Sequence, residues 1–309
     1  MTVDAATAEL LRGSLASMFG DRPHDLATAL DELGWADVVD ADTELAQDLL
    51  MAEHARALST APALDAVAAA ALGLAASTRF VWPYFGASSR GLPSPCSGLV
   101  EVRGLLLGDI PDAAMVPGGG GVFSCDLASL EVRPIGGVDP TAGWHLVSGT
   151  LRLSRPERDW ALAELAATRG LASSLLALAE SALEVAIAHV RSRHQFGQAV
   201  GSYQGVRHRL AGAYAALAGA QSLLTAATVE GGLPAARLAK AAAGRAHDRV
   251  AREAIQVCGA VGLSAEFPLA GFVRRGFLLD AFFASGRDII RSFGQALADG
   301  ADPVRVGKF

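Results

Sequence analysis

The sequence predicts a mostly α-helical protein with a small β domain in the middle of the chain, an α+β fold. Apolar residues recur at spacings of three and four residues up to about residue 77 and again after Arg155-Pro156. Between these stretches, residues 78–154 contain seven of the thirteen prolines, a run of four glycines and short β-type runs. We therefore expect an N-terminal helical domain over 1–77, a middle β domain over 78–154 and a C-terminal four-helix bundle over 155–309.

The N-terminal helical pattern is interrupted at three places, Gly20–Pro23, the region near Ala41–Thr43, and Thr60–Pro62. Glycine, proline and N-cap residues at such breaks separate one helix from the next. This part of the chain should therefore hold three or four helices. In the β domain, Leu99–Val102 and Leu146–Leu153 have the apolar, β-branched composition that is typical of strands.

Four helical stretches predict the bundle. The first ends near Arg193, where cations favour the carbonyl end of the helix dipole, and Gly197 suits a left-handed C-cap. Ser202 is a candidate N-cap for the second helix. The third begins at Pro234 and runs to about Cys258. A fourth should span Gly276–Leu297, because its apolar residues keep near-helical spacing.

Composition excludes several classes of function. Hydrophobic residues make up 51% of the 309, enough for a substantial core, and the net charge of −6 argues against nucleic-acid binding, which needs a basic face. The three cysteines have no C-x-x-C spacing, which indicates neither a disulfide framework nor a zinc site. The acidic N-terminus is unlike a secretory signal, and the apolar run Ala66–Thr78 is too short to span a bilayer. We expect a soluble cytoplasmic protein.

Two other groups of residues resemble functional sites, but both are explained without a function. Glu53-His54 and His208 carry groups that bind metals, but no second and third ligand falls at helical or turn spacing, so no metal site is predicted. The glycine run Gly118–Gly121 is not followed by the Gly-Lys-Ser/Thr of a phosphate loop, and we interpret it as a surface turn.

Three stretches of the bundle carry a family resemblance. They are Arg193-His194-Gln195-Phe196-Gly197, the pair Tyr203-Gln204, and the turn from Gln256 to Gly262, in which Ala260 replaces one glycine. In this order and at these separations they resemble the Arg-x-x-Phe-Gly, Phe/Tyr-Gln and Gln-x-x-Gly-Gly-x-Gly motifs of the acyl-CoA dehydrogenase family. The helix, sheet and bundle plan is also similar to that family's. The resemblance is strong over residues 165–297 and poor over the β domain.

The resemblance implies an FAD site that is shared between subunits. In the family, these motifs reach across a dimer interface to the pyrophosphate and adenosine of the neighbouring subunit's FAD. A guanidinium pairs with phosphate oxygens in a fixed fork, and a glycine turn lets backbone amides approach an anion. The implied cofactor-binding residues are Arg193, Gln195, Phe196, Gln204, Gln256, Gly259 and Ala260.

The family's catalytic base is missing from both of its usual places. The commoner position, before the last helix, falls on Ala284 or Ser285, depending on the alignment, and the alternative position falls on Thr168. None of these side chains accepts a proton usefully. The nearest carboxylates, Asp288, Glu164 and Asp280, are interpreted as solvated or helix-terminal charges. The loop that covers flavin and substrate in the family also has no counterpart between residues 77 and 154, so the β domain is a reduced one.

A non-catalytic subunit would show this combination, in which the motifs for a neighbour's cofactor are present and the base and the covering loop are missing. The chain resembles the shortened subunit of actinobacterial heteromeric α2β2 acyl-CoA dehydrogenases, which act on steroid-derived CoA thioesters. The resemblance implies a dimer or tetramer in which a full-length partner supplies the glutamate and binds the acyl-CoA, and this chain completes the FAD site. Two alternatives remain open: an autonomous homodimeric acyl-CoA dehydrogenase with an unusual base such as Asp288, and a flavin-free binding scaffold of the same fold.

Overall fold

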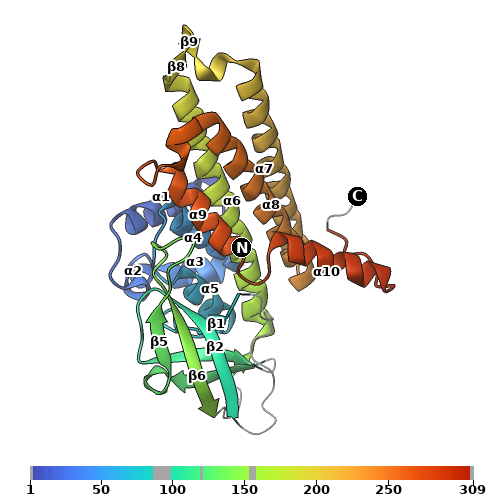
Figure 1. The fold of residues 1–309 in the computed structure, drawn as a ribbon. Helices are drawn as coiled ribbons and strands as arrows, with labels where there is room; N and C mark the ends of the chain where they lie inside the picture. Colours follow the sequence, from blue (N-terminus) through green and yellow to red (C-terminus); the bar gives the residue numbers. More distant parts are fainter. Residues whose placement is uncertain (1–2, 86–98, 119–120, 153–157, 307–309) are drawn as a thin grey trace.

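A computed structural model of the protein describes residues 3–85, 99–118, 121–152 and 158–306 (Figure 1). In these residues the chain forms a group of N-terminal helices, two antiparallel sheets and a long C-terminal bundle, from which the last helix projects to one side (Figure 1). The fold is mostly helical with a small sheet portion, as predicted. The centre of the expected glycine turn and the start of the expected bundle at Arg155-Pro156 lie outside the described residues.

The N-terminal part has one more break than the sequence pattern predicts. Its described helices are α1 (Ala5–Gly20), α2 (Leu26–Glu32), α3 (Trp35–Ala41), α4 (Thr43–Arg56) and α5 (Ala63–Ala71). The three predicted breaks coincide with helix ends, but a further turn at Gly34 separates α2 from α3, so the expected three or four helices are five. Aspartate side chains at Asp4, Asp25 and Asp42 accept hydrogen bonds from the first turns of α1, α2 and α4.

Two small antiparallel sheets follow. The four-stranded sheet has the order β1 (Trp82–Pro83), β2 (Leu99–Leu107), β6 (Trp144–Arg152), β5 (Glu131–Pro134), and the three-stranded sheet has the order β3 (Ala113–Gly118), β4 (Gly121–Asp126), β7 (Arg158–Asp159). A short 3-10 turn, η1 (Leu127–Ser129), follows β4. Side chains such as Val102, Leu106, Val116, Phe123 and Val147 form a core of their own between strands of the two sheets.

The C-terminal part is built around one central helix. Its elements are α6 (Ala161–Ser192), β8 (His194–Gln195), β9 (Gln198–Ala199), η2 (Val200–Ser202), α7 (Gln204–Glu230), α8 (Leu233–Cys258), η3 (Gly259–Leu263), α9 (Leu269–Asp280) and α10 (Gly286–Ala298). α6 contacts α7, α8 and α9 of the bundle and α4 and α5 of the N-terminal part. Most of its 32 residues are buried, and small side chains let these neighbours approach closely.

The expected fourth bundle helix is wrong in its bounds, because the segment from Gly276 to Leu297 is divided between α9 and α10. Residues 281–285 leave the helical path, and Phe283 and Ala284 adopt positive φ values of 56° and 75°. The fully buried Lys240 ammonium donates hydrogen bonds to the carbonyl oxygens of Asp280, at 3.0 Å, and Ala284, at 2.7 Å. The buried cation thus satisfies two carbonyl oxygens that backbone amides would satisfy in a continuous helix. The spacing of apolar side chains in the sequence gives no sign of this interaction.

Two of the described helices, α6 and α7, are long and apolar enough to cross a membrane by length and composition alone. The most apolar window of α6 is 72% buried inside the protein, as expected for a core helix, whereas that of α7 is only 22% buried. In the structure both helices pack in the C-terminal bundle (Figure 1).

Buried charged groups tie the three parts together. Asp65 of α5 is fully buried and accepts hydrogen bonds from the Arg79 Nε, at 2.7 Å, and the Trp82 Nε1, at 2.6 Å. Arg275 of α9 is also buried and pairs at 2.5 Å with Asp139 of the β region, while its Nη1 donates to the Ser59 carbonyl at 2.8 Å. One guanidinium therefore joins the bundle, the β region and the N-terminal helices.

His54 should make the fold sensitive to mild acid. Its Nε2 lies 2.8 Å from the Ala61 carbonyl oxygen, and its buried Nδ1 has no hydrogen-bond partner among the described residues. Burial, together with the charge of Arg275, lowers the pKa of His54 to about 4. The stability contributed by the neutral ring is complete above pH ~6.5, where the unfolded chain is also neutral, and is lost as the pH falls through about 4.

We expect the free energy of unfolding to fall by about 2 kcal/mol between pH 7 and pH 5 because of this group. Urea titrations at the two pH values measure the fall. His54→Asn has no ring to protonate and should show a smaller fall than the parent protein. An equal fall in the variant and the parent would exclude His54 as the origin.

Candidate functional site

The tip of the bundle is a β-hairpin that connects α6 to α7 (Figure 1). Arg193 leaves the helix in an extended conformation, and its carbonyl accepts a hydrogen bond from the Val200 amide at 2.8 Å. Phe196 and Gly197 turn the chain with positive φ values of 52° and 83°. The expectation that Gly197 caps the helix is therefore wrong: the helix ends at Ser192, and Gly197 lies in the hairpin turn.

The predicted residues of this stretch face solvent. Phe196 is 93% exposed, and Arg193, Gln195 and Gln204 are also exposed. In the described part of the chain the Arg193 guanidinium makes no hydrogen bond or ion pair, and the Gln195 amide donates only to a neighbouring backbone carbonyl. The Tyr203 hydroxyl donates to the Gln195 carbonyl oxygen at 3.1 Å, which fixes the hairpin against the start of α7.

The start of α7 differs from its expected form at one residue. Tyr203, and not Ser202, occupies the N-cap position, and the Ser202 hydroxyl donates back to the Ala199 carbonyl oxygen at 2.7 Å. Gln204 is the first helical residue, as expected, and its amide nitrogen lies 3.5 Å from the His208 Nε2. The Gln204 amide is therefore held only weakly and can turn toward a ligand.

The third predicted stretch lies at the same end of the bundle. Arg209 of α7 pairs with Glu253 of α8 at 2.8 Å, which places the end of α8 beside the start of α7. Gln256 lies on the last turn of α8 and is exposed. Gly259 follows it with a φ of 66°, and Ala260 continues into η3. The structure thus gathers the predicted residues of all three stretches at one exposed end.

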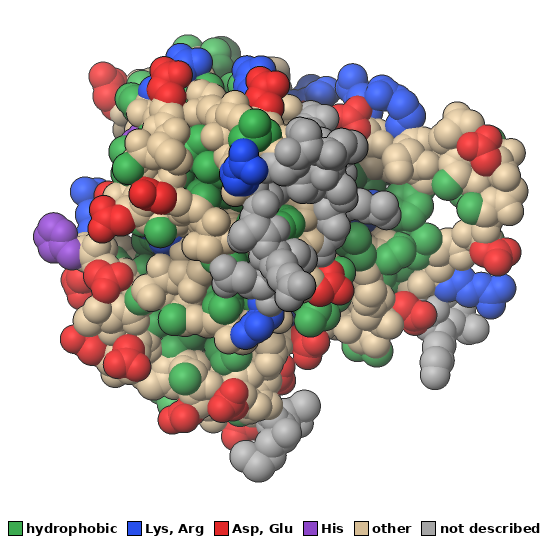
Figure 2. Space-filling view, turned by 90° about the horizontal axis from the view of Figure 1, so that it is seen from below, with side chains coloured by type: hydrophobic (Ala, Val, Ile, Leu, Met, Phe, Trp, Pro, Cys, Tyr) green, Lys and Arg blue, Asp and Glu red, His purple; other side chains and the backbone are tan. Residues whose placement is uncertain are grey.

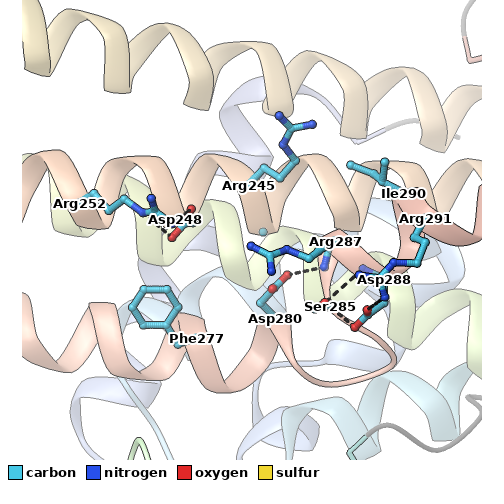
Figure 3. Close-up of a pocket in the computed structure, with 12 residues that line it drawn as sticks. Arg245, Asp248, Arg252, Phe277, Asp280, Ser285, Arg287, Asp288, Ile290 and Arg291 are labelled. Atoms are coloured by element: carbon cyan, nitrogen blue, oxygen red, sulfur yellow. Dashed lines mark hydrogen bonds and ion pairs between the residues drawn. The ribbon is translucent and has the colours of Figure 1, made fainter. Parts of the chain in front are cut away.

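Ser285, one of the two residues aligned with the commoner base position, lines a cavity between α8, α9 and α10. The loop before α10 holds Ala284 and Ser285, and Figure 3 shows Ser285 with Asp288 and Asp280 at the edge of this cavity. The cavity has a volume of about 700 Å³ and is lined by, among others, Arg245, Asp248, Arg252, Phe277, Arg287 and Arg291. No carboxylate stands at either of the two aligned base positions.

Asp288 is a poor proton acceptor. Its carboxylate accepts a hydrogen bond from the Ser285 hydroxyl at 2.7 Å and pairs with Arg291 at 3.0 Å, and it is largely exposed. The hydrogen bond from Ser285 and the charge of Arg291 hold the pKa of Asp288 below its ordinary value. Asp280 accepts a hydrogen bond from the Gly286 amide at 3.1 Å. Both carboxylates are helix-terminal charges, as predicted.

Thr168, at the alternative base position, is buried within the protein. Thr168 is 2% exposed, and its hydroxyl donates to the Glu164 carbonyl oxygen at 2.7 Å within α6. Glu164 is helix-terminal, as predicted, but it is buried and not solvated, and its carboxylate pairs with Arg237 of α8 at 2.8 Å. The sequence pattern does not show this, because the partner is contributed by a helix about 70 residues away.

Comparisons with known proteins bear on the bundle first. Residues 158–281 match the family model of the acyl-CoA dehydrogenase C-terminal domain. Acyl-CoA dehydrogenase IpdE2 of Mycobacterium tuberculosis is 29% identical over 121 residues, 39% of this chain and 38% of that protein. The 3-sulfinopropanoyl-CoA desulfinase of Paraburkholderia xenovorans is 34% identical over 109 residues, 34% of this chain and 28% of that protein. The matches therefore span well under half the length of these two relatives.

Residues 158–281 thus belong to the acyl-CoA dehydrogenase C-terminal domain family.

Solved structures extend the likeness of fold to the whole chain. A chain of the Tcur3481-Tcur3483 steroid ACAD variant covers 95% of this chain and 98% of its own length, with a TM-score of 0.75 and 18% identity. A chain of the ChsE4-ChsE5 complex from Mycobacterium tuberculosis covers 97% and 99%, with a TM-score of 0.73 and 19% identity. The helices, sheets and bundle together thus have the acyl-CoA dehydrogenase fold.

An aromatic cluster fills the junction between the four-stranded sheet and the bundle of this acyl-CoA dehydrogenase fold. Its rings belong to Phe80, Trp82, Phe85, Trp144, Trp160, Phe282 and Phe283. The rings of Phe282 and Phe283 stack with their centroids 5.0 Å apart. The centroid of the Trp82 ring lies 5.7 Å from that of Phe283 and 5.6 Å from that of Trp160. The sequence analysis missed this cluster, although the run Trp82-Pro83-Tyr84-Phe85 and the pair Phe282-Phe283 were signals for it.

The chemistry of the bundle tip fits a dinucleotide phosphate group. Arg193 offers a guanidinium that has no partner among the described residues, Gln204 and Gln256 offer exposed amides, and the positive φ of Gly259 leaves the backbone next to them accessible. The exposed Phe196 ring offers an aromatic surface for a base. These groups come from three separate elements, which is the arrangement needed to hold an extended ligand at several points.

Proposed function

We propose that this chain is a non-catalytic subunit that completes the FAD site of a heteromeric acyl-CoA dehydrogenase. The observation that carries the proposal is an asymmetry within one chain. The bundle tip keeps exposed donors at Arg193, Gln204 and Gln256, whereas the base positions hold Ala284, Ser285 and Thr168. Exposed donors without a base of their own are what we expect of a subunit that acts on a neighbour's cofactor.

The tip residues would bind the nucleotide end of FAD and take no part in the reaction itself. Arg193 would pair with a pyrophosphate oxygen, and the Gln204 and Gln256 amides would bond the ribose or adenine. FAD, when bound, accepts the hydride that leaves the acyl chain. Because Phe196 is exposed at the hairpin turn, we place its ring against the adenine face.

The residues at the aligned base positions of this chain are not suited to abstract a proton from the substrate. Desaturation of an acyl-CoA begins with removal of a proton next to the thioester, which needs a carboxylate near the reacting carbon. Ala284 has only a methyl group, and the Thr168 hydroxyl donates its hydrogen bond to a backbone carbonyl oxygen. Ser285 and Arg291 hold the pKa of Asp288 below its ordinary value. We therefore assign the catalytic glutamate and the acyl-CoA to the partner subunit.

We further propose a steroid-derived CoA thioester as the substrate class of the assembled enzyme. Support comes from the structural neighbours, of which one is described as a steroid ACAD and another is the two-protein ChsE4-ChsE5 complex. The assembly would be a dimer or tetramer in the cytoplasm. The shortened middle region leaves the acyl pocket to the full-length partner.

The test is flavin content with and without a partner. We expect the chain expressed alone to carry no stoichiometric FAD by absorbance, and to gain it when co-expressed with a full-length acyl-CoA dehydrogenase subunit encoded beside it. Turnover of an acyl-CoA should appear only in the complex. Full flavin and turnover in the isolated chain, abolished by Asp288→Asn, would favour an autonomous homodimer. Absence of flavin from every preparation, with no effect of Arg193→Ala, would favour a flavin-free scaffold.

A further inference from the structure

Acidic charge is concentrated in the N-terminal helices. Residues 1–77 contain thirteen Asp or Glu and only three Arg, with no Lys, a formal charge of −10. The whole chain has a charge of −6, so the remaining residues sum to +4. In the view from below, acidic side chains are numerous on the left side of the molecule (Figure 2). A charge asymmetry of this size between parts of a chain favours contact with a basic partner.

An open groove lies within this acidic part, between α2, α3 and α5. It has a volume of about 630 Å³. Its floor is apolar and is formed by Leu30, Trp35, Val39, Ala66, Ala70 and Leu74. Leu30 and Trp35 are buried, whereas Val39, Ala70 and Leu74 are partly exposed at the floor. An apolar hollow of this kind gains free energy when another apolar side chain displaces its water.

The rim of the groove carries three exposed carboxylates, Asp25, Asp31 and Asp40. Hydrogen bonding by Thr28 lowers the pKa of Asp25, so this group is ionised at neutral pH. In the described part of the chain, the carboxylates of Asp31 and Asp40 accept no hydrogen bond and form no ion pair. Two acceptors beside an apolar floor are therefore free for cations of another molecule.

We infer that this groove docks a segment of a second protein, in which one or two large apolar side chains are flanked by Lys or Arg. The apolar anchors would occupy the floor, and the cations would pair with Asp31 and Asp40. Nucleic acids and anionic lipid surfaces carry the same sign of charge as the rim and are repelled. A second copy of this chain presenting the same face is also disfavoured, because two rims that each carry Asp25, Asp31 and Asp40 would meet. The inference does not depend on the proposed function, since the groove is formed by the N-terminal helices and not by the bundle tip.

The experiment is a selection from a random peptide library displayed on phage, with the full chain as the target. Bound peptides are then synthesised with a fluorescent label and titrated by anisotropy. We expect the selected peptides to share apolar residues flanked by Lys or Arg and to bind more weakly as salt is raised. Because each exposed pair adds modestly, reversal of two rim charges in Asp31→Lys/Asp40→Lys should weaken binding about tenfold or more.

Two matched variants separate the groove from general acidity. Asp21→Lys/Glu32→Lys changes the net charge of the same helices equally but touches no residue of the groove, and it should weaken binding less than about twofold. Ala36→Trp adds a ring at an exposed position that lines the groove and should abolish binding. Equal weakening by both charge pairs, unchanged binding to Ala36→Trp, or selection of no basic apolar peptide would overturn the inference. Flavin content of the complex is unaffected in either case and tests the proposed function separately.

Discussion

Replacement of Arg193 by alanine is expected to weaken FAD retention by the heteromeric complex about tenfold or more. A hydrogen bond between a charged donor and a phosphate oxygen contributes about 1.5–3 kcal/mol. The side chain is exposed and makes no ion pair in the described structure, so its removal should leave the fold unchanged. The loss would therefore appear in cofactor binding and not in the thermal stability of the isolated chain.

The measurement is flavin released on dialysis of the co-expressed complex, followed by absorbance. Arg191→Ala is the matched control, because Arg191 is also exposed, at the end of the same helix, but lies outside the Arg-x-x-Phe-Gly motif. Arg193→Lys should give an intermediate loss, since an ammonium keeps the charge but lacks the planar fork. Equal flavin retention by Arg193→Ala and Arg191→Ala would show that the guanidinium does not hold the cofactor.

Sequence periodicity predicts the fold well where a helix has one apolar face and fails where partners come from elsewhere in the chain. The breaks at Gly20–Pro23, Ala41–Thr43 and Thr60–Pro62 are visible because their residues cannot continue a helix. The break before α10 is not visible, because the apolar residues of both helices remain in phase. It depends on Lys240, 40 or more residues earlier, whose buried ammonium binds carbonyl oxygens of that loop.

The candidate site shows the same division. The gathering of Arg193, Gln204 and Gln256 at one end follows from the antiparallel order of α6, α7 and α8, so the sequence motifs and the helix lengths predict it together. The hairpin turn at Gly197 and the burial of Glu164 could not be read in this way. The first depends on strand pairing across four residues, and the second on Arg237 of another helix.

Arg275→Met is expected to lower the free energy of unfolding by about 3–5 kcal/mol, the largest stability effect that we predict. Arg275 is 3% exposed, and its Nε pairs with Asp139 at 2.5 Å, while its other nitrogens donate to the carbonyls of Leu58, Ser59 and Thr141. Although burial opposes ionisation, hydrogen bonds from Thr141 and Arg275 keep the pKa of Asp139 below its ordinary value. Methionine would fill much of the same volume but leave this carboxylate buried without its cation.

Urea unfolding of the isolated chain at pH 7, followed by tryptophan fluorescence, measures the effect. Arg274→Met is the matched control on the same helix, because the Arg274 Nε donates only to the Ala270 carbonyl within α9, and its loss should cost less than about 1 kcal/mol. The double variant Arg275→Met/Asp139→Asn removes the unpaired charge and should recover part of the stability. If the double variant is no more stable than Arg275→Met, the loss arises from the three carbonyls and not from the carboxylate, because these acceptors are left unpaired in both variants.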